Sequence, residues 1–522
     1  MNEAKTITKH FAALLLFSLS AAVASRAQET KPEAPQAPGL VVQSRLVVLD
    51  VVVTDAKCDV RNDLKREDFS VTEDGDPQTI THFETPAEHQ VPSGVQIRST
   101  ADLERIAPQA PATIVVLDEL NTAYEDMAYS RYALKKYLES QPGTLTVPTM
   151  LVAVNEKKLQ VIVDYTQDRT ALESGLAKHL AHFPWNLKVG GGRMEQLAVT
   201  LGGLEQVTQA AAGHPGHKNV LWIGHGFPGI DLTAPGLDQN SVAGITSGVQ
   251  QALNMMRDAR VTLYTIDPAV MTSETGIRIT NDAMGTQVGD VSSQDPFVSD
   301  VAFSKLATAS GGKIFGRRND IDRQIARSAQ YGASFYTLTY RPSSHSDAAQ
   351  AYRKIKVTLR DPSLSAGFRD GYYARNELLP ENHASRSKYD LDAAAENRLV
   401  YTGLHLRAVE KPESAGSFVV GVPQNEITWN PLADNEEAHL KLVTSVFDPH
   451  GKLLQRKSED LTEHRPFGGS GGRSEPARLQ VQTALPAGAS RVRFVVWDAA
   501  SGHLGTTEVH LSGTPADAPE KR

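Results

Sequence analysis

A carboxylate, an amide and a hydroxyl follow one apolar segment of this chain within four residues. The segment "ATIVVLD" ends at Asp118, and Asn121 and Thr122 come shortly after it. An almost continuously apolar run of this length is typical of a buried strand in a parallel sheet, and ligands bind at the carboxyl ends of such strands. Oxygen atoms are the ligands that a hard cation such as Mg²⁺ prefers. These three residues raise the question whether this strand end is half of a metal site. The alternative is that Asp118 caps the next helix or binds loop amides.

The histidine-containing motifs do not complete a catalytic or zinc site. "GHGFPG" at 224–229 fits G-x-G-x-x-G, but prolines follow and no helix starts promptly to meet a phosphate. The pairs "HLAH" and "HPGH" lack the spacing and the third ligand of a zinc site. His225 stands where an esterase loop would carry its serine. We therefore predict that the chain is not an enzyme. A hydrolase with a site around His225, Asp118 and Asp267 is the less favoured alternative.

The elements that would position these residues alternate between strands and helices over residues 111–330. The expected strands are "ATIVVLD", "TVPTMLVAVN", "LQVIVDYTQD", "KNVLWIG" and "VTLYTID". Between the first two, "YEDMAYSRYALKKYLES" reads as an amphipathic helix with an apolar set at Met127, Tyr132, Leu134 and Leu138. Strands that alternate with helices predict an α/β fold, with a doubly wound, mainly parallel sheet covered on both faces.

All-β segments flank this region in a chain whose 522 residues are too many for one core. Residues 43–92 read as a strand and a hairpin, with turn chemistry at "EDGDP". Residues 331–375 read as consecutive strands, and we expect them to form one β-unit with the N-terminal strands. Residues 376–399 read as a linker. Alternating apolar residues over 400–513 predict a C-terminal β-sandwich.

Several segments in a fixed order resemble the VWFA-related family known best from acidobacteria. They include "VVLDELNT", "KNVLWIGHGFP", "VTLYTIDP", "LATASGGKIF" and "SFYTLTYRP", within residues 43 to 375. The resemblance implies a Rossmann-like von Willebrand factor type A domain at 111–330. It also implies an exported, non-catalytic protein-interaction or adhesion function, although a fold alone does not prove a function.

Type A domains commonly hold Mg²⁺ at a metal-ion-dependent adhesion site, and this chain carries only part of the pattern. The family's pattern is Asp-x-Ser-x-Ser after the first strand, a Thr from a second loop and an Asp from a third. Asp118 and Thr122 match the ends of the first motif, but Leu120 offers no side-chain oxygen. Asn121 is a candidate substitute for Leu120, although alternate residues of an extended chain face apart. His225 stands near the place of the third-loop Asp, and Thr200 falls inside an expected helix. The resemblance thus implies a degenerate site with no certain cofactor, at which Mg²⁺ would bind weakly.

The same strand ends are where we expect a partner to bind, and the partner is expected to be a protein or a surface polymer. The net charge of −8 and the lack of a long basic run argue against nucleic acid. A structural role in the cell envelope, acting through the C-terminal region, is the alternative. The candidate contact residues are Asp118, Asn121, Thr122, His225 and Phe227.

The N-terminus has the pattern of an export signal. Lysines precede the apolar run "FAALLLFSLSAAV", and small residues follow at "AVA" and "SRA". The run is shorter than the ~20 residues that a membrane-spanning helix needs, and no later segment is apolar enough to span a bilayer. We therefore expect a signal peptide at 1–27, a Pro-rich linker at 28–42 and no transmembrane segment after cleavage. The expected location is the periplasm, the outer surface or the medium.

Overall fold

The computed structural model describes residues 46–155, 159–181, 192–268, 295–316, 319–342, 352–373, 391–411, 414–432, 435–466 and 475–511. The signal peptide and the linker expected at 1–42 lie outside the described residues, as does most of the linker expected at 376–399. The last part of that second linker, residues 391–396, is helical.

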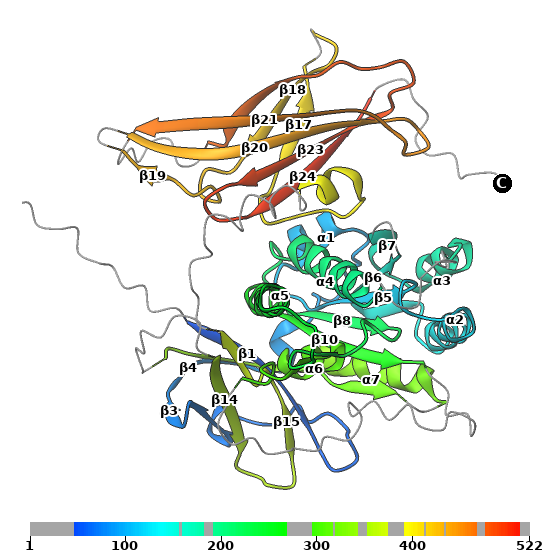
Figure 1. Cartoon of the computed structure of the whole chain (residues 1–522), viewed down its shortest axis with the longest axis vertical. Coiled ribbons are helices and arrows are strands. Elements are labelled where there is room, and N and C mark those ends of the chain that lie inside the picture. The colour runs from blue at the N-terminus through cyan, green and yellow to red at the C-terminus, as the bar shows by residue number, and fades with distance from the viewer. Residues whose placement is uncertain are drawn as a thin grey trace, which may run out of the picture. The chain divides into compact units, whose positions relative to one another are not determined.

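A six-stranded sheet forms the centre of the region that was expected to be α/β (Figure 1). Its strand order is β12-β10-β8-β5-β6-β7. Neighbouring strands run parallel from β12 to β6, and only β7, at the edge, pairs antiparallel. The predicted mainly parallel sheet is therefore present as a mixed sheet. The strands are β5 (Ala112–Asp118), β6 (Thr144–Val154), β7 (Leu159–Asp168), β8 (Lys218–Ile223), β10 (Val261–Asp267) and β12 (Ile314–Gly316).

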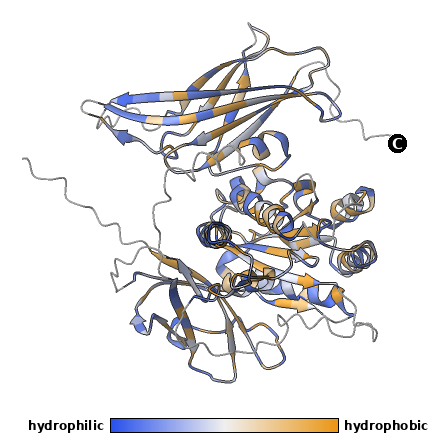
Figure 2. Ribbon diagram, in the orientation of Figure 1, coloured by the Kyte–Doolittle hydropathy of each residue, from blue (hydrophilic) through white to orange (hydrophobic). Residues whose placement is uncertain are grey.

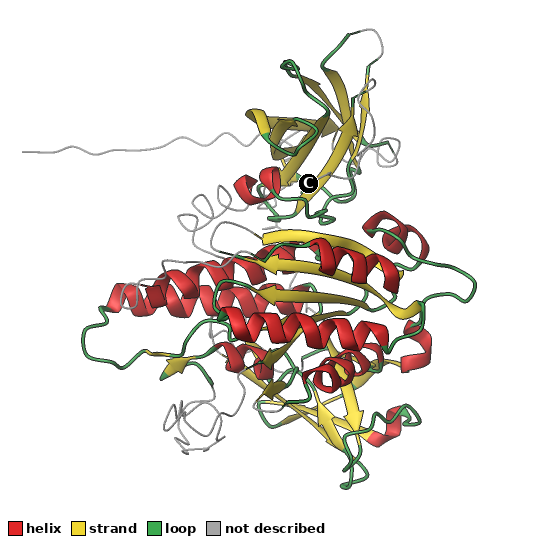
Figure 3. Cartoon of the chain, turned by 90° about the vertical axis from the view of Figure 1, so that its right-hand side faces the viewer, coloured by secondary structure: helices red, strands yellow, loops and turns green. Residues whose placement is uncertain are grey.

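Helices cover both faces of this sheet, as Figure 3 also shows. Buried side chains of α4, α5 and α6 form one cluster with Ile114 and Val116, and those of α2, α3 and α7 form another with Val115 and Leu117. Successive residues of a strand point to opposite faces, so β5 is buried on both. The helices are α1 (Thr100–Ile106), α2 (Tyr124–Glu139), α3 (Arg169–Lys178), α4 (Gly192–Ala210), α5 (Gln239–Asp258), α6 (Phe303–Ala309) and α7 (Ile321–Ala333).

Helix α2 follows the expected amphipathic pattern except at one residue. Met127, Leu134 and Leu138 are buried, whereas the side chain of Tyr132 is exposed, with 63% of its surface accessible. At 3.6 residues per turn, a separation of five residues places Tyr132 about 140° around the helix from Met127. Tyr132 therefore belongs to the polar face, contrary to the sequence prediction.

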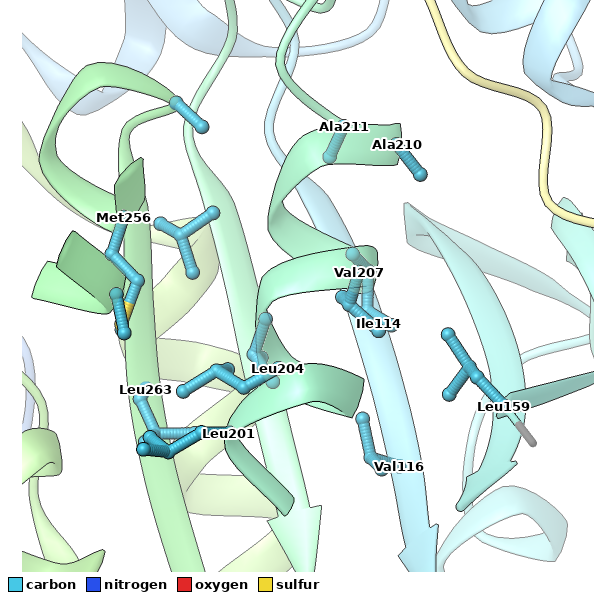
Figure 4. Packing of buried hydrophobic residues seen from close by; sticks show 14 of the residues in the cluster. Ile114, Val116, Leu159, Leu201, Leu204, Val207, Ala210, Ala211, Met256 and Leu263 are labelled. Carbon is cyan, nitrogen blue, oxygen red and sulfur yellow. The ribbon is translucent and has the colours of Figure 1, made fainter. Parts of the chain in front are cut away.

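Helix α4 packs tightly against β5. Leu201, Leu204 and Val207 are spaced three residues apart and so share one face of the helix. Figure 4 shows this face beside Ile114 and Val116, and all five side chains belong to one buried cluster. Hydropathy colouring in Figure 2 shows the same arrangement, with hydrophobic residues along the central strands. This packing determines which residues of α4 lie near the end of β5.

Strands from before and after the α/β region pair with each other. β1 pairs antiparallel with β13, and β2 pairs antiparallel with β14. The two four-stranded sheets, β15-β1-β13-β4 and β16-β14-β2-β3, share one buried cluster. The α/β region is thus inserted into a β-unit. Its strands are β1 (Val47–Thr54), β2 (Phe69–Glu73), β3 (Asp76–Gln78), β4 (Ile80–Glu84), β13 (Tyr336–Tyr340), β14 (Tyr352–Leu359), β15 (Ser365–Gly367) and β16 (Gly371–Tyr373).

The C-terminal region contains two antiparallel sheets. One has the order β17-β18-β22, and the other has the order β19-β20-β23-β24 with β21 also paired to β20. Residues of both belong to one buried cluster, in which the rings of Phe418 and Phe494 lie 5.1 Å apart. The strands are β17 (Arg407–Glu410), β18 (Ser417–Val422), β19 (Asn430–Pro431), β20 (Asn435–Phe447), β21 (Leu453–Pro466), β22 (Ala477–Gln482), β23 (Arg491–Asp498) and β24 (Leu504–His510).

The described residues form several helices, from α1 to α7. None of them combines the length and the hydropathy that spanning a membrane requires.

Candidate functional site

Asp118 is the last residue of β5 and is completely buried at the carboxyl end of the sheet. Its Oδ1 accepts hydrogen bonds from the backbone nitrogen of Asn121 at 3.0 Å and from Asn121 Nδ2 at 3.1 Å. Its Oδ2 accepts from Asn121 Nδ2 at 3.0 Å, from Trp222 Nε1 at 3.0 Å and from the backbone nitrogen of Gly226 at 2.9 Å. Burial raises the pKa of Asp118, and these N–H donors oppose that rise. The carboxyl group is therefore surrounded by hydrogen-bond donors.

Asn121 reaches Asp118 because the chain turns after β5. The backbone nitrogen of Glu119 already bonds the carbonyl of Leu117 at 3.1 Å, and the residues from 119 to 121 form a turn. Alternate residues face apart only in an extended segment, so in this turn the Asn121 side chain can face the same side as Asp118. Asn121 Nδ2 also donates to Thr200 Oγ1 at 2.9 Å. Its Oδ1 is buried and has no hydrogen-bond partner among the described residues.

Thr200 belongs to this site although it lies well inside α4. Its side chain is completely buried, and its hydroxyl meets the Asn121 amide. Sequence reasoning had set Thr200 aside because a helical residue is not a loop ligand. The path of α4 past the end of β5 brings it there, and no local pattern signals that path. Trp222, on β8, was also missed, because only the pairing of β8 with β5 shows that its ring reaches Asp118.

The residues at this strand end do not fit a Mg²⁺ ion. Both oxygens of Asp118 are occupied by N–H donors, and a donor nitrogen of Asn121 lies between the oxygens of Asp118 and Thr200. Mg²⁺ needs near-octahedral oxygen ligands, and buried Leu120 supplies none from its side chain. Within the described ranges, no group of three or more His, Cys, Asp or Glu side chains is placed to hold a metal. The donor set is therefore that of a hydrogen-bonded anchor.

His225 lies between two carboxylates on the outer side of the same edge. Its Nδ1 is 2.7 Å from Asp267 Oδ1, at the end of β10, and its Nε2 is 3.2 Å from Asp126 Oδ2, in the first turn of α2. Burial alone would lower the pKa of His225, but the hydrogen bonds and charges of Asp267 and Asp126 outweigh it and raise the pKa. Both ring nitrogens face carboxylates, so neither faces a hydroxyl or a thiol that the imidazole could activate.

The glycines of the "GHGFPG" segment allow its close approach to β5. Gly224 has φ +144°, and a Cβ atom there would lie 2.4 Å from Thr122 Oγ1 and 2.5 Å from Asp118 Cβ. Gly226 has φ +65°, and a Cβ atom there would lie 2.2 Å from the ring of Phe303. These glycines therefore have a packing role, and the next helix, α5, begins only at Gln239.

Three of the five residues predicted to contact a partner are internal. Asp118, Thr122 and Phe227 each expose 4% or less of their surface, and the Phe227 ring packs edge-on against Phe303 at 5.4 Å. Thr122 Oγ1 accepts a hydrogen bond from the backbone nitrogen of His225 at 3.3 Å. These side chains cannot touch a partner in this arrangement, because the loops close over them. Asn121 and His225 are partly accessible.

No protein-family model and no curated protein matches this chain. Proximal thread matrix protein 1 from the mussel byssus is 12% identical with a TM-score of 0.20, covering 34% of this chain and 39% of its own. The SpRpn10 VWA domain is 14% identical with a TM-score of 0.16, covering 30% of this chain and 89% of its own. The chain thus spans about two fifths of the mussel protein. The VWA match is consistent with the type A resemblance, but likenesses this weak carry no argument.

Proposed function

We propose that this chain is an exported, non-catalytic protein that binds a protein or surface-polymer partner through its type A region without a metal ion. The observation that carries the proposal is the saturation of Asp118 by N–H donors, with the Asn121 amide in the place that a cation would take. A carboxylate from a partner would therefore find no metal ion whose coordination shell it could complete. Recognition would rest on the accessible side chains around the site.

These accessible side chains, here named the strand-end surface, combine an aromatic ring with acidic groups. Tyr124 exposes 62% of its surface, and aromatic residues are enriched in protein interfaces. The carboxylates outnumber the one histidine, which favours a cationic or uncharged partner over an acidic one. The strand-end surface consists of Asn121, Tyr124, Glu125, Asp126, His225 and Asp267.

We also propose that the two C-terminal sheets form a β-sandwich. Sheets that pack face to face bury their facing side chains in one shared core. A single buried cluster that contains Val420 from the first sheet, and Leu442 and Val496 from the second, supports this arrangement.

The binding proposal is tested by capture from an extract of the producing cells' envelope. The immobilised full chain is compared with the double variant Tyr124→Ala, His225→Ala, each in Mg²⁺ and in EDTA, and captured proteins and polymers are quantified. We expect equal capture in both buffers and at least about tenfold less by the double variant, because central aromatic contacts dominate binding energy. The matched control is Tyr132→Ala, whose ring is equally exposed on the same helix. Loss of capture in EDTA, or full capture by the double variant, contradicts the proposal.

Export is tested separately. Cells that produce the full chain are fractionated beside cells that produce a chain beginning after Ala27. We expect the full chain outside the cytoplasm and the shortened chain within it, because the apolar run and the small residues act as a signal. Equal distribution of the two forms contradicts export through residues 1–27.

A further inference from the structure

A cavity of about 370 Å³ opens in the C-terminal region, in elements other than those of the strand-end surface. Its lining comes from the connection between β18 and β19 and from the end of β21. The volume falls within the ~300–1,000 Å³ of typical small-molecule sites. The lining residues are Gln424, Asn425, Ile427, Trp429 and Arg465.

Hydrogen bonds to other parts of the C-terminal region hold the connection that lines the cavity in place. The carboxylate of Glu426 accepts hydrogen bonds from the backbone nitrogen of His405 at 2.7 Å and from its ring Nδ1 at 2.9 Å. The backbone nitrogen of Thr428 donates to Asp498 Oδ2 at 2.9 Å. Ile427, between them, is buried in the core. A site whose backbone is fixed in advance loses little entropy when a ligand binds.

Trp429 and Arg465 form an ordered pair in the cavity wall. The guanidinium carbon of Arg465 lies 4.3 Å from the centre of the Trp429 ring, and Arg465 Nε donates to Glu436 Oε2 at 2.6 Å. Trp429 Nε1 donates to the backbone carbonyl of Gln424 at 2.9 Å. The positive charge of Arg465 is therefore already neutralised. Its terminal nitrogens bond no other described residue and can still donate to a ligand.

The side-chain amides of Gln424 and Asn425 take no hydrogen bond from, and give none to, any residue that the structure describes. Each primary amide offers an acceptor oxygen and two N–H donors. A hydroxyl group likewise both donates and accepts. Adjacent free amides beside an aromatic ring therefore match a molecule that carries several hydroxyl groups on a ring with apolar C–H groups.

We propose that this cavity binds a carbohydrate, an uncharged sugar unit of a glycan. C–H groups of the sugar would pack on the part of the Trp429 side chain that lines the cavity, and its hydroxyls would bond the amides of Gln424 and Asn425 and the terminal nitrogens of Arg465. An anionic ligand fits less well, because Glu436 pairs with Arg465. The site goes beyond the proposed function and shares no residue with the strand-end surface.

The test uses the full chain and soluble oligosaccharides of glucose, galactose, mannose and N-acetylglucosamine, with binding followed by saturation-transfer NMR and calorimetry. We expect saturable binding of at least one of them, weakened at least tenfold by Gln424→Ala with Asn425→Ala. Both side chains are accessible, so the variant should fold. The matched control is Asn430→Ala, an exposed amide that does not line the cavity. Arg465→Lys should also weaken binding, because an ammonium cannot form the same planar contact.

Three outcomes would overturn the proposal. They are the absence of saturable binding to any of the sugars, sugar binding that the double amide variant leaves unchanged, and cavity-dependent binding of a random peptide pool in place of sugars. The double variant Tyr124→Ala, His225→Ala should keep full sugar binding, so a failure of this site is distinguishable from a failure at the strand-end surface.

Discussion

The side-chain nitrogen of Asn121 lies 3.1 and 3.0 Å from the two carboxylate oxygens of Asp118 and 2.9 Å from the hydroxyl oxygen of Thr200. An amide N–H group therefore supplies, at this strand end, the positive charge density that a bound cation supplies in a metal-dependent site. The arrangement holds β5, the following turn and α4 together. It also leaves the outer loops as the surface that a partner can reach.

Metal binding is the most direct check of this arrangement. We expect titration of Mg²⁺ or Mn²⁺ into the full chain to release no saturable heat, because no oxygen of Asp118 is open to a cation. Asp118→Ala should give the same flat titration. Saturable heat in the wild type that disappears in Asp118→Ala would show a working metal site.

Replacing Asp118 by asparagine should destabilise the protein. The substituted amide would turn N–H groups toward donors such as Trp222 Nε1, and buried unsatisfied groups cost about 1–3 kcal/mol. The measurement is the free energy of unfolding in urea. The control is Glu125→Gln, an exposed carboxyl-to-amide change a few residues away, which should stay within about 0.5 kcal/mol of the wild type. Equal stability of the two variants would contradict the anchoring role of Asp118.

His225 should make stability depend on pH in the neutral range. Its pKa is raised in the folded protein, so its contribution is complete below the unfolded value of ~6.5 and is lost as pH rises through the folded pKa. We expect the difference in unfolding free energy between wild type and His225→Gln to be largest near pH 6 and to shrink toward about pH 9. His450→Gln, the same substitution at an exposed histidine, is the matched control. A difference that does not change with pH for His225→Gln would refute the ion pairs with Asp126 and Asp267.

A buried ion pair should secure the β-unit to the α/β region. Asp50 on β1 accepts from Arg260 Nε at 3.2 Å and from His217 Nδ1 at 2.9 Å. Burial would raise the pKa of Asp50, but the charge of Arg260 and the hydrogen bonds from Arg260 and His217 outweigh it and hold that pKa well below its usual range. Removing one partner of such a pair costs about 3–5 kcal/mol, and we expect this loss for Asp50→Asn in chemical unfolding.

An exposed pair of the same residue types serves as the control for Asp50. Asp63 lies 2.7 Å from Arg61, but its side chain is 66% exposed. We expect Asp63→Asn to cost much less than Asp50→Asn, because water and salt screen surface pairs. If Asp50→Asn costs no more than Asp63→Asn, the pair does not join the two parts of the fold.

Sequence periodicity was sufficient to predict the elements of the α/β region. The apolar run that ends at Asp118 is β5, and both of its faces are covered, as a continuous run of that kind indicates. The alternation of strands and helices also predicted a mainly parallel sheet. The local pattern predicted the burial of single residues less well, since Tyr132 lies on the exposed face of α2.

The sequence by itself determined that Asp118 ends a buried strand and that Leu120 offers a metal no oxygen, because these follow from side-chain chemistry and from a repeat read over a few residues. Only the tertiary structure decided that the Asn121 amide meets Thr200 and that His225 lies between Asp126 and Asp267. These residues come from separate helices, loops and a strand end. The distances between these side chains are set by the packing of α4 on β5 and by the close approach of the glycine-containing segment at 224–229 to β5. Neither can be predicted from spacing along the chain.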